Sequence, residues 1–459
     1  MTSSATPSAA RAQALAIVLA GSIVAPLDSA VNAAFPAINA AFGLEVASIR
    51  WVVICYLVAF SSCVMVSGRL GDLYGYRRVF GAGLLVSTAA FLACGLAPDY
   101  AWLLGARVVQ GIGIALVLGA APALALSIYP ESERTRVLAR FGAAFAGGLA
   151  LGPALGGALV DAFGWQAVYF ARLPLALGAW LLLGRVPATP QTSRSRFDIS
   201  GSTLLATWSG SLMLGIALPG YAGIAFGLLA VSTFAWFVVR ELRSSQPMIR
   251  LSLFQTAAFS VPNLAAVSVH FTGFIVFLLG PYLFVRELGL TAQVAGLLLA
   301  LGPVGAMLGS ALAVRLVANF GARPAAFAGM LLNLAAVAVA STWDGATAIA
   351  TIGSWLALGG IGIGLFQVTY SDLVIAALSP EERGVASSLT NFTRTLGVVA
   401  CAVVGSALFH GAESQALAEG AAGSAAFLKG YGFAFGSVAA GVGLFIVLTL
   451  LRPRVWFPR

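Results

Sequence analysis

The sequence predicts an all-α polytopic membrane protein. Of its 459 residues, 60% are hydrophobic and only 9% are charged, and the mean hydropathy is +0.96. Soluble domains carry about 25% charged residues, so this composition excludes an ordinary globular protein. The apolar residues also recur in runs of about 20, the length that an α-helix needs to cross a bilayer. We therefore expect a bundle of membrane-spanning helices.

Fourteen such runs can be placed along the chain. They lie near residues 12–34, 48–67, 79–97, 100–122, 137–160, 164–184, 200–217, 221–240, 258–284, 291–314, 324–341, 347–372, 384–409 and 430–451. With both termini in the cytoplasm, 19 basic residues fall in cytoplasmic segments, and Arg107 and Arg394 fall within spans. Only four, at positions 50, 172, 286 and 429, fall outside. This asymmetry obeys the positive-inside rule and predicts that orientation.

An internal repeat divides the spans into two related sets. The segment 68–77 overlays 314–323 at an offset of 246, and Glu133, Gly148 and Gly156 overlay Glu382, Gly397 and Gly405 at an offset of 249. Related halves are typical of transporters. We expect an N-terminal six-helix bundle over 1–184, a linker with two additional helices over 185–257, and a C-terminal six-helix bundle over 258–459.

The fifth span contains an unusual set of small residues. Gly148, Gly152 and Gly156 recur every four residues, so one helix face carries no side chains and a partner backbone can approach it closely. Pro153 and Gly157 complete a Gly-x3-Gly-Pro-x2-Gly-Gly pattern. An ordinary tight crossing would explain the glycine spacing alone. The whole pattern resembles the antiporter signature on the fifth helix of proton-driven exporters in the major facilitator superfamily.

Asp28 is the one acid that lies deep within a span. A carboxylate in hydrocarbon is costly, so it is expected to face the bundle interior and to be functional. Burial and a nearby cation act on it in opposite directions, which could let it take up and release a proton. Asn32 lies one turn on, on the same face. The run resembles the first-helix motif of the fourteen-helix drug:proton antiporters, although a purely structural role for Asp28 is the alternative.

Span four offers a cation at the same depth. Arg107 and Gln110 share a helix face in a run that resembles the superfamily's Arg-x2-Gln-Gly motif. At about 1.5 Å per residue, Asp28 and Arg107 both lie roughly 10 Å below the outer surface. We therefore predict an Asp28–Arg107 pair as the proton-coupling site, with Asn32 and Gln110 as candidate substrate contacts.

The loop after span two resembles the cytoplasmic loop motif of the superfamily. The matching residues are Gly68, Asp72, Gly75, Arg77 and Arg78. An acid at a helix end beside arginines can form charge-assisted bonds that hold one state of a rocking transporter. A solvated basic turn is the alternative. In the second copy Ala318 replaces Asp72, so any such latch is asymmetric.

Aromatic and polar residues of later spans are candidates for the substrate path. They are His270, Phe274, Phe366, Gln367 and Tyr370. Aromatic rings could hold flat or cationic compounds by cation–π contact, although packing explains any single ring equally well. We expect no cofactor and no metal. The only lysine, Lys429, is followed by Gly430, which excludes a Gly-x4-Gly-Lys-Ser/Thr phosphate loop.

Together these resemblances imply the major facilitator fold, with two six-helix bundles plus two inserted helices. They imply a proton-coupled exporter of drugs or antibiotics, multi-pass in a bacterial inner membrane and functional as a monomer, whose partners are protons, a small molecule and the bilayer rather than nucleic acid. A metabolite uniporter or importer on the same fold is the alternative. A membrane enzyme or a non-transporting sensor is less favoured, because no cluster of His, Cys or paired carboxylates supports catalysis.

Overall fold

The computed structural model describes residues 8–130, 133–187, 199–218, 220–243, 251–377 and 383–457. Within these ranges the regular structure is helical throughout. The α-helices are α1 (Ser8–Ser22), α2 (Ala30–Ala33), α3 (Phe35–Phe42), α4 (Arg50–Tyr74), α5 (Tyr76–Gly95), α6 (Tyr100–Ser127), α7 (Arg134–Phe163), α8 (Ala167–Phe170), α9 (Leu173–Leu182), α10 (Ile199–Ala217), α11 (Gly220–Arg243), α12 (Ala257–Tyr282), α13 (Ala292–Phe320), α14 (Ala322–Ala340), α15 (Ile349–Ala376), α16 (Arg383–Ala418) and α17 (Gly423–Leu450).

Thirteen helical segments of the described residues are long and apolar enough to cross a membrane. They match thirteen of the fourteen predicted spans. The remaining one, near 200–217, is occupied by the 19-residue helix α10. The all-α membrane fold is therefore confirmed, and the count of fourteen spans stays a prediction. The connection 188–198 and the polar stretch 244–250, which hold several of the basic residues used for orientation, lie outside the described residues.

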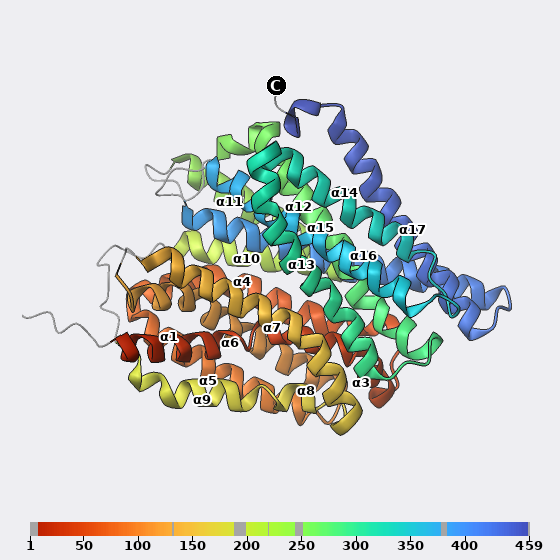
Figure 1. The fold of residues 1–459 in the computed structure, drawn as a ribbon, viewed down its shortest axis with the longest axis horizontal. Helices are drawn as coiled ribbons and strands as arrows, with labels where there is room; N and C mark the ends of the chain where they lie inside the picture. Colours follow the sequence, from red (N-terminus) through yellow and green to blue (C-terminus); the bar gives the residue numbers. More distant parts are fainter. Residues whose placement is uncertain are drawn as a thin grey trace, which may run out of the picture.

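The long helices gather into two groups that meet side by side (Figure 1). Helices α4, α5 and α6 pack on one another in the first group, and α13, α14 and α15 do so in the second. The groups meet where α7 packs along α13 and where α4 contacts α16. The additional helices α10 and α11 pair with each other, and α10 also lies against α4 and α16. This pair therefore sits at the edge of the contact between the two groups.

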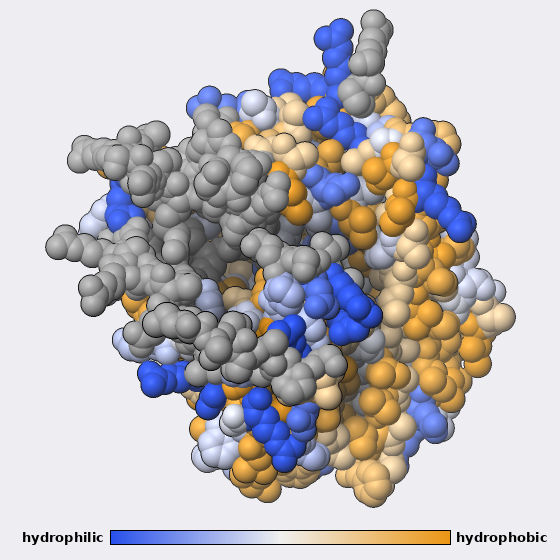
Figure 2. All heavy atoms as spheres, turned by 60° about the vertical axis from the view of Figure 1, so that its left-hand side comes forward, coloured by the Kyte–Doolittle hydropathy of each residue, from blue (hydrophilic) through white to orange (hydrophobic). Residues whose placement is uncertain are grey.

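Large apolar side chains remain exposed on the outward faces of several helices. Examples are Tyr221 on α11, Val314 on α13 and Leu444 on α17. Figure 2 shows hydrophobic residues covering one side of the molecule, while hydrophilic residues gather toward the end that carries many of the loops. Exposed apolar faces of this extent are what a lipid-facing surface requires.

Two predicted spans are interrupted rather than continuous helices. In the first, α1 ends at Ser22 and a 3-10 turn, η1 (Pro26–Ser29), precedes α2. In the sixth, α8 ends at Phe170 and α9 begins at Leu173, with Pro174 in its first turn. Proline has no backbone N–H and clashes with the preceding turn, so both prolines favour a new helical start over continuation. The breaks place Asp28 and Arg172 on distorted backbone inside the first group.

Candidate functional site

Asp28 is the centre of a buried ion network. Its side chain is 13% exposed and lies in η1. Arg107 donates from Nη1 to Oδ1 at 2.7 Å and from Nη2 to Oδ2 at 2.9 Å. Arg172 Nη1 donates to Oδ1 at 2.6 Å, and Gln110 Nε2 donates to the same oxygen at 2.8 Å. All four bonds are donated to Asp28, which fits the acceptor-only carboxylate form. The predicted Asp28–Arg107 contact is confirmed.

Both guanidinium groups are fixed by further contacts. Arg107 Nε donates to the carbonyl oxygen of Val52 at 2.9 Å, and its guanidinium carbon lies 4.5 Å from the ring centroid of Tyr56. The guanidinium carbon of Arg172 lies 4.4 Å from the ring centroid of Phe91. Cation–π contacts of this kind gain strength when the cation is removed from water. Each arginine is therefore held in place from two sides and is only 2% exposed.

Arg172 corrects the sequence prediction. The count of basic residues by loop places it outside the membrane, but the structure buries it against Asp28. Arg172 lies at the break between α8 and α9, which falls within the predicted span 164–184 rather than at its outer end. The signal was present in the sequence: Arg172 stands between apolar residues within the run 164–184, directly before Leu173 and Pro174.

The network carries more positive than negative charge. Asp28 supplies one carboxylate, whereas Arg107 and Arg172 supply two guanidinium groups. Arg172 Nη2 is buried and has no hydrogen-bond partner among the described residues. Breaking a buried ion pair leaves an uncompensated charge at high cost. A proton added to Asp28 would therefore disturb both arginines at once.

The glycine-rich face of α7 holds the broken segment that carries Asp28. A side chain at Gly148 would collide with Ile23 and Pro26, and one at Gly156 would meet the backbone of Ala30. Ser29 Oγ also donates to the carbonyl oxygen of Leu149 at 3.2 Å. The predicted close approach of a partner backbone is thus confirmed for this face. Gly152 takes part in the same contact, against Ser29 and Ala30.

The end of α7 also joins the two helix groups. Gly157 lies against the backbone of Ala292, and the carbonyl of Pro153 lies against Gly296. Asp161 accepts the backbone N–H of Ala292 at 3.0 Å and that of Gln293 at 2.7 Å. These are the first residues of α13, where unpaired N–H groups and the helix dipole favour an anion. We call this contact the Asp161 cap; it closes the two groups at this end of the bundle.

The loop motif joins α4 to α5. Gly75 has φ +88°, which only glycine adopts without strain, and Arg77 Nη1 donates to the carbonyl oxygen of Val186 at 2.9 Å. Arg78 is exposed. Gly68 lies in α4, and the side chain of Asp72 lies outside the described part of the structure. The proposed latch therefore stays a prediction.

The predicted substrate contacts divide into two groups. His270 Nε2 lies 3.0 Å from Gln367 Oε1, and both side chains are partly exposed, as are Asn32 and Phe274. Three other predicted contacts are buried in this structure, and their role in substrate binding stays a prediction. Gln110 belongs to the Asp28 network, and Phe366 stacks on Tyr370 within a core cluster. Tyr370 also donates its hydroxyl to Asn263 Oδ1 at 2.8 Å, so it serves packing in this state.

Arg394 is the remaining deep cation. It lies on α16, and its guanidinium carbon is 6.0 Å from the ring centroid of Phe145 on α7. The contact therefore connects the two helix groups. Its side chain is exposed although the helix lies within a predicted span. An exposed arginine at such a position fits a polar space between the groups.

The chain is similar in sequence to a known family and to several known proteins. The sequence profile of the Major Facilitator Superfamily matches residues 17–400. The multidrug resistance protein Stp of Mycobacterium tuberculosis is 31% identical over 82% of this chain and 72% of its own length. The methylenomycin A resistance protein of Streptomyces coelicolor is 31% identical over 91% of this chain and 90% of its own. These relatives are transport and resistance proteins rather than enzymes.

A third relative and a solved structure widen the comparison. The riboflavin transporter RibZ of Clostridioides difficile is 25% identical over 88% of each chain. A crystal structure of a bacterial homolog of the human lysosomal transporter Spinster, in an inward-facing and unoccupied conformation, superposes with a TM-score of 0.71. It covers 98% of both chains at 14% identity, a level at which the likeness concerns the fold.

Proposed function

We propose that this chain, which belongs to the Major Facilitator Superfamily, is a proton-coupled antiporter that exports small hydrophobic or cationic compounds by alternating access. Its relatives at 31% identity are named for multidrug and antibiotic resistance. The antiporter-like glycine face of α7 supports export over import. The observation that carries the proposal is the Asp28 network, in which one titratable carboxylate is bonded to two buried arginines.

The network suggests how a proton changes the state of the protein. The Asp161 cap closes one end of the bundle, and the ionised form of Asp28 fits the four bonds donated to it. In the proposed cycle, substrate enters from the cytoplasm in this state and leaves outward after the halves rock. Protonation of Asp28 on the outer side then frees Arg107 and Arg172. Release of the proton inward restores the network shown here.

The driving force is sufficient for drug export. One proton that falls through 100 mV releases about 2.3 kcal/mol. Since about 1.4 kcal/mol corresponds to a tenfold ratio, a single proton sustains a substrate gradient of tens-fold. The proposed partners are therefore only protons, the exported molecule and the bilayer. We place the protein, as a monomer, in the bacterial inner membrane with both termini in the cytoplasm, as the distribution of basic residues indicates.

The substrate path follows from exposure and position. Asn32 and Phe274, with the bonded pair His270 and Gln367, keep partly exposed side chains and are the proposed contacts. The loop residues Gly68, Asp72, Gly75, Arg77 and Arg78 are proposed to stabilise one state of the cycle rather than to bind substrate.

The test is uptake into inverted membrane vesicles across a panel of dyes and antibiotics, with and without an imposed pH gradient. We expect gradient-dependent uptake by the wild type and none by Asp28→Asn. Asp344→Asn, in an exposed loop, is the matched control and should transport normally. Gradient-dependent uptake by Asp28→Asn at the wild-type rate would remove Asp28 from the coupling mechanism.

A second candidate follows from the riboflavin transporter among the relatives. On this reading the same fold moves a metabolite without a proton gradient. Uptake of flavins or other metabolites by intact cells, unaffected by collapse of the pH gradient, would favour it. Accumulation of dyes in cells that lack the protein, reversed by the wild type but not by Asp28→Asn, would favour export.

A further inference from the structure

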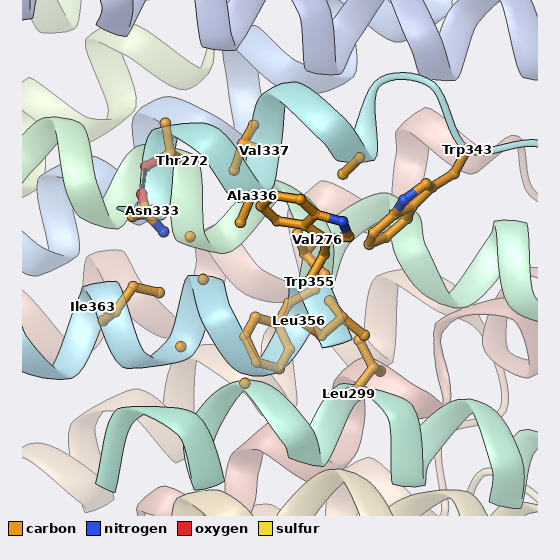
Figure 3. Close-up of a pocket in the computed structure, with 16 residues that line it drawn as sticks. Thr272, Val276, Leu299, Asn333, Ala336, Val337, Trp343, Trp355, Leu356 and Ile363 are labelled. Atoms are coloured by element: carbon orange, nitrogen blue, oxygen red, sulfur yellow. Dashed lines mark hydrogen bonds between the residues drawn. The ribbon is translucent and has the colours of Figure 1, made fainter. Parts of the chain in front are cut away.

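The second helix group contains an apolar cavity between α12, α13, α14 and α15. Figure 3 shows it, with Trp343 and Trp355 at one end and the hydrogen-bonded pair Thr272 and Asn333 at the other. The cavity volume is about 40 Å³. A single water needs about 10–15 Å³ on the same scale, so the cavity is larger than one water.

The two helix groups contain equivalent close contacts of glycines with backbone carbonyl oxygens. In the first group, a side chain at Gly83 would meet the carbonyl oxygen of Gly113, and one at Gly111 would meet that of Tyr56. In the second group, a side chain at Gly329 would meet the carbonyl oxygen of Gly362, and one at Gly360 would meet that of Gly302. These contacts are related by offsets of 246 for α4 and α5 and 249 for α6. They are the offsets of the sequence repeat. The two groups are thus built alike, residue by residue, around these helix crossings.

The same offsets place the cavity where the first group holds its ion network. Leu356 lies 249 residues after Arg107, and Gly359 lies 249 residues after Gln110. Both line the cavity. A leucine replaces a guanidinium and a glycine replaces an amide, so polar side chains and much of their volume are missing. Protein interiors normally close such voids.

One polar group at the cavity has no hydrogen-bond partner among the described residues. Trp343 is 4% exposed, and its buried Nε1 makes no hydrogen bond within this part of the chain. In Figure 3 the indole of Trp343 lies beside that of Trp355 at the cavity. A buried indole N–H usually finds an acceptor. An apolar space bordered by two indoles and one unused donor matches a small aromatic group that carries an oxygen.

We propose that this cavity is a binding site for a small uncharged aromatic group, whose oxygen accepts the Nε1–H of Trp343. The site is separate from the Asp28 network and lies at the equivalent position in the second group. It rests on the proposed function in one respect only: the natural occupant is the apolar part of an exported compound. The first group thus handles charge, and the second group receives an uncharged ring.

Binding can be measured without transport. The full-length protein in lipid nanodiscs is dialysed to equilibrium against labelled phenol or toluene, and uptake by empty nanodiscs is subtracted. Phenol carries the oxygen and toluene does not. We expect saturable binding of both, with phenol about fivefold tighter because of one neutral hydrogen bond. Trp343→Phe keeps an aromatic ring but removes the donor, so it should bind the two probes equally.

Filling the cavity supplies the second arm. Gly302→Val places new atoms beside the cavity, where a Cβ would have only Phe277 Cζ, at 3.9 Å, within reach. It should weaken both probes at least tenfold. Gly105→Val makes the same change on α6, where a Cβ would meet none of the described residues within 4 Å, and should bind as the wild type does. Unchanged phenol binding in Gly302→Val, or a phenol preference that survives Trp343→Phe, would overturn the proposal. Loss of proton-driven transport with intact binding would count against the proposed function alone.

Discussion

The two arginines of the Asp28 network make unequal predictions for stability. Arg172→Leu removes one bond of 2.6 Å to Asp28, but Arg107 still donates two bonds to the carboxylate. Asp28 thus stays paired, and we expect a loss of about 1.5–3 kcal/mol, the contribution of one hydrogen bond to a charged group. Asp28→Asn instead leaves two guanidinium groups without a counter-charge. Breaking a buried pair in this way costs about 3–5 kcal/mol.

Reversible unfolding of the purified protein in mixed micelles measures both losses. The double variant Asp28→Asn/Arg172→Leu should be more stable than the sum of the single changes predicts, because the second change removes one of the uncompensated cations. Arg452→Leu, at an exposed site, is the matched control and should stay near the wild type. If Arg172→Leu is as stable as Arg452→Leu, or if the two changes in the network are additive, the electrostatic reasoning is wrong.

The remaining predictions concern the contacts between the helix groups and one outer turn. Asp161→Ala removes the cap on α13, a contact that contributes about 1–2 kcal/mol. Spin labels at the ends of α7 and α13 should therefore report a roughly 5- to 30-fold larger population of separated ends. An unchanged distribution of distances between the labels would contradict this. Gly157→Val should abolish transport because it collides with the backbone of α13. Gly142→Val should be tolerated, because a Cβ there would meet no atom of the described residues within 4 Å. The hydroxyl of Thr347 bonds Asp344 and lowers the pKa of that carboxyl, so Thr347→Val should raise this pKa towards its ordinary value, as carboxyl NMR titration can show. Because the lowered pKa stabilises the turn only while Asp344 is ionised, that contribution is lost as the pH falls.

The sequence was sufficient where a physical rule tied a residue to one place. A buried acid and a buried arginine at equal depth in hydrocarbon have few other charged partners to pair with, and Asp28 and Arg107 are indeed paired. Glycines at a four-residue spacing leave a bare helix face, and the α7 face does receive the backbone of the first span. The repeat offsets hold at the level of individual helix crossings.

Sequence reasoning failed where the backbone departs from a regular helix. The count of basic residues places Arg172 outside the membrane, but it lies within the run 164–184, at the break before α9, and is buried against Asp28. The burial of the aromatic candidates could not be predicted from the sequence for a different reason. Phe366 and Tyr370 are aromatic residues of the kind found in binding sites, but both are buried. The periodicity and hydropathy of a fully apolar helix do not indicate which of its sides faces a cavity.

The comparison of the two halves bears on how coupling is divided. Residues at equivalent positions differ most where function is proposed: Arg107 and Gln110 in the first half correspond to Leu356 and Gly359 in the second. A second charged network would add another buried desolvation cost without adding a titratable acid, since Asp28 is the only carboxylate deep within a predicted span. With one proton-binding centre in the first half and an uncharged site in the second, only the first half changes its charge during the proposed cycle. Introducing charge into the second half tests this division: Leu356→Arg should be destabilising, because no carboxylate lines the cavity in the described part of the chain to pair with its guanidinium. Reversible unfolding in mixed micelles measures the effect, and a Leu356→Arg variant as stable as the wild type would contradict this reasoning.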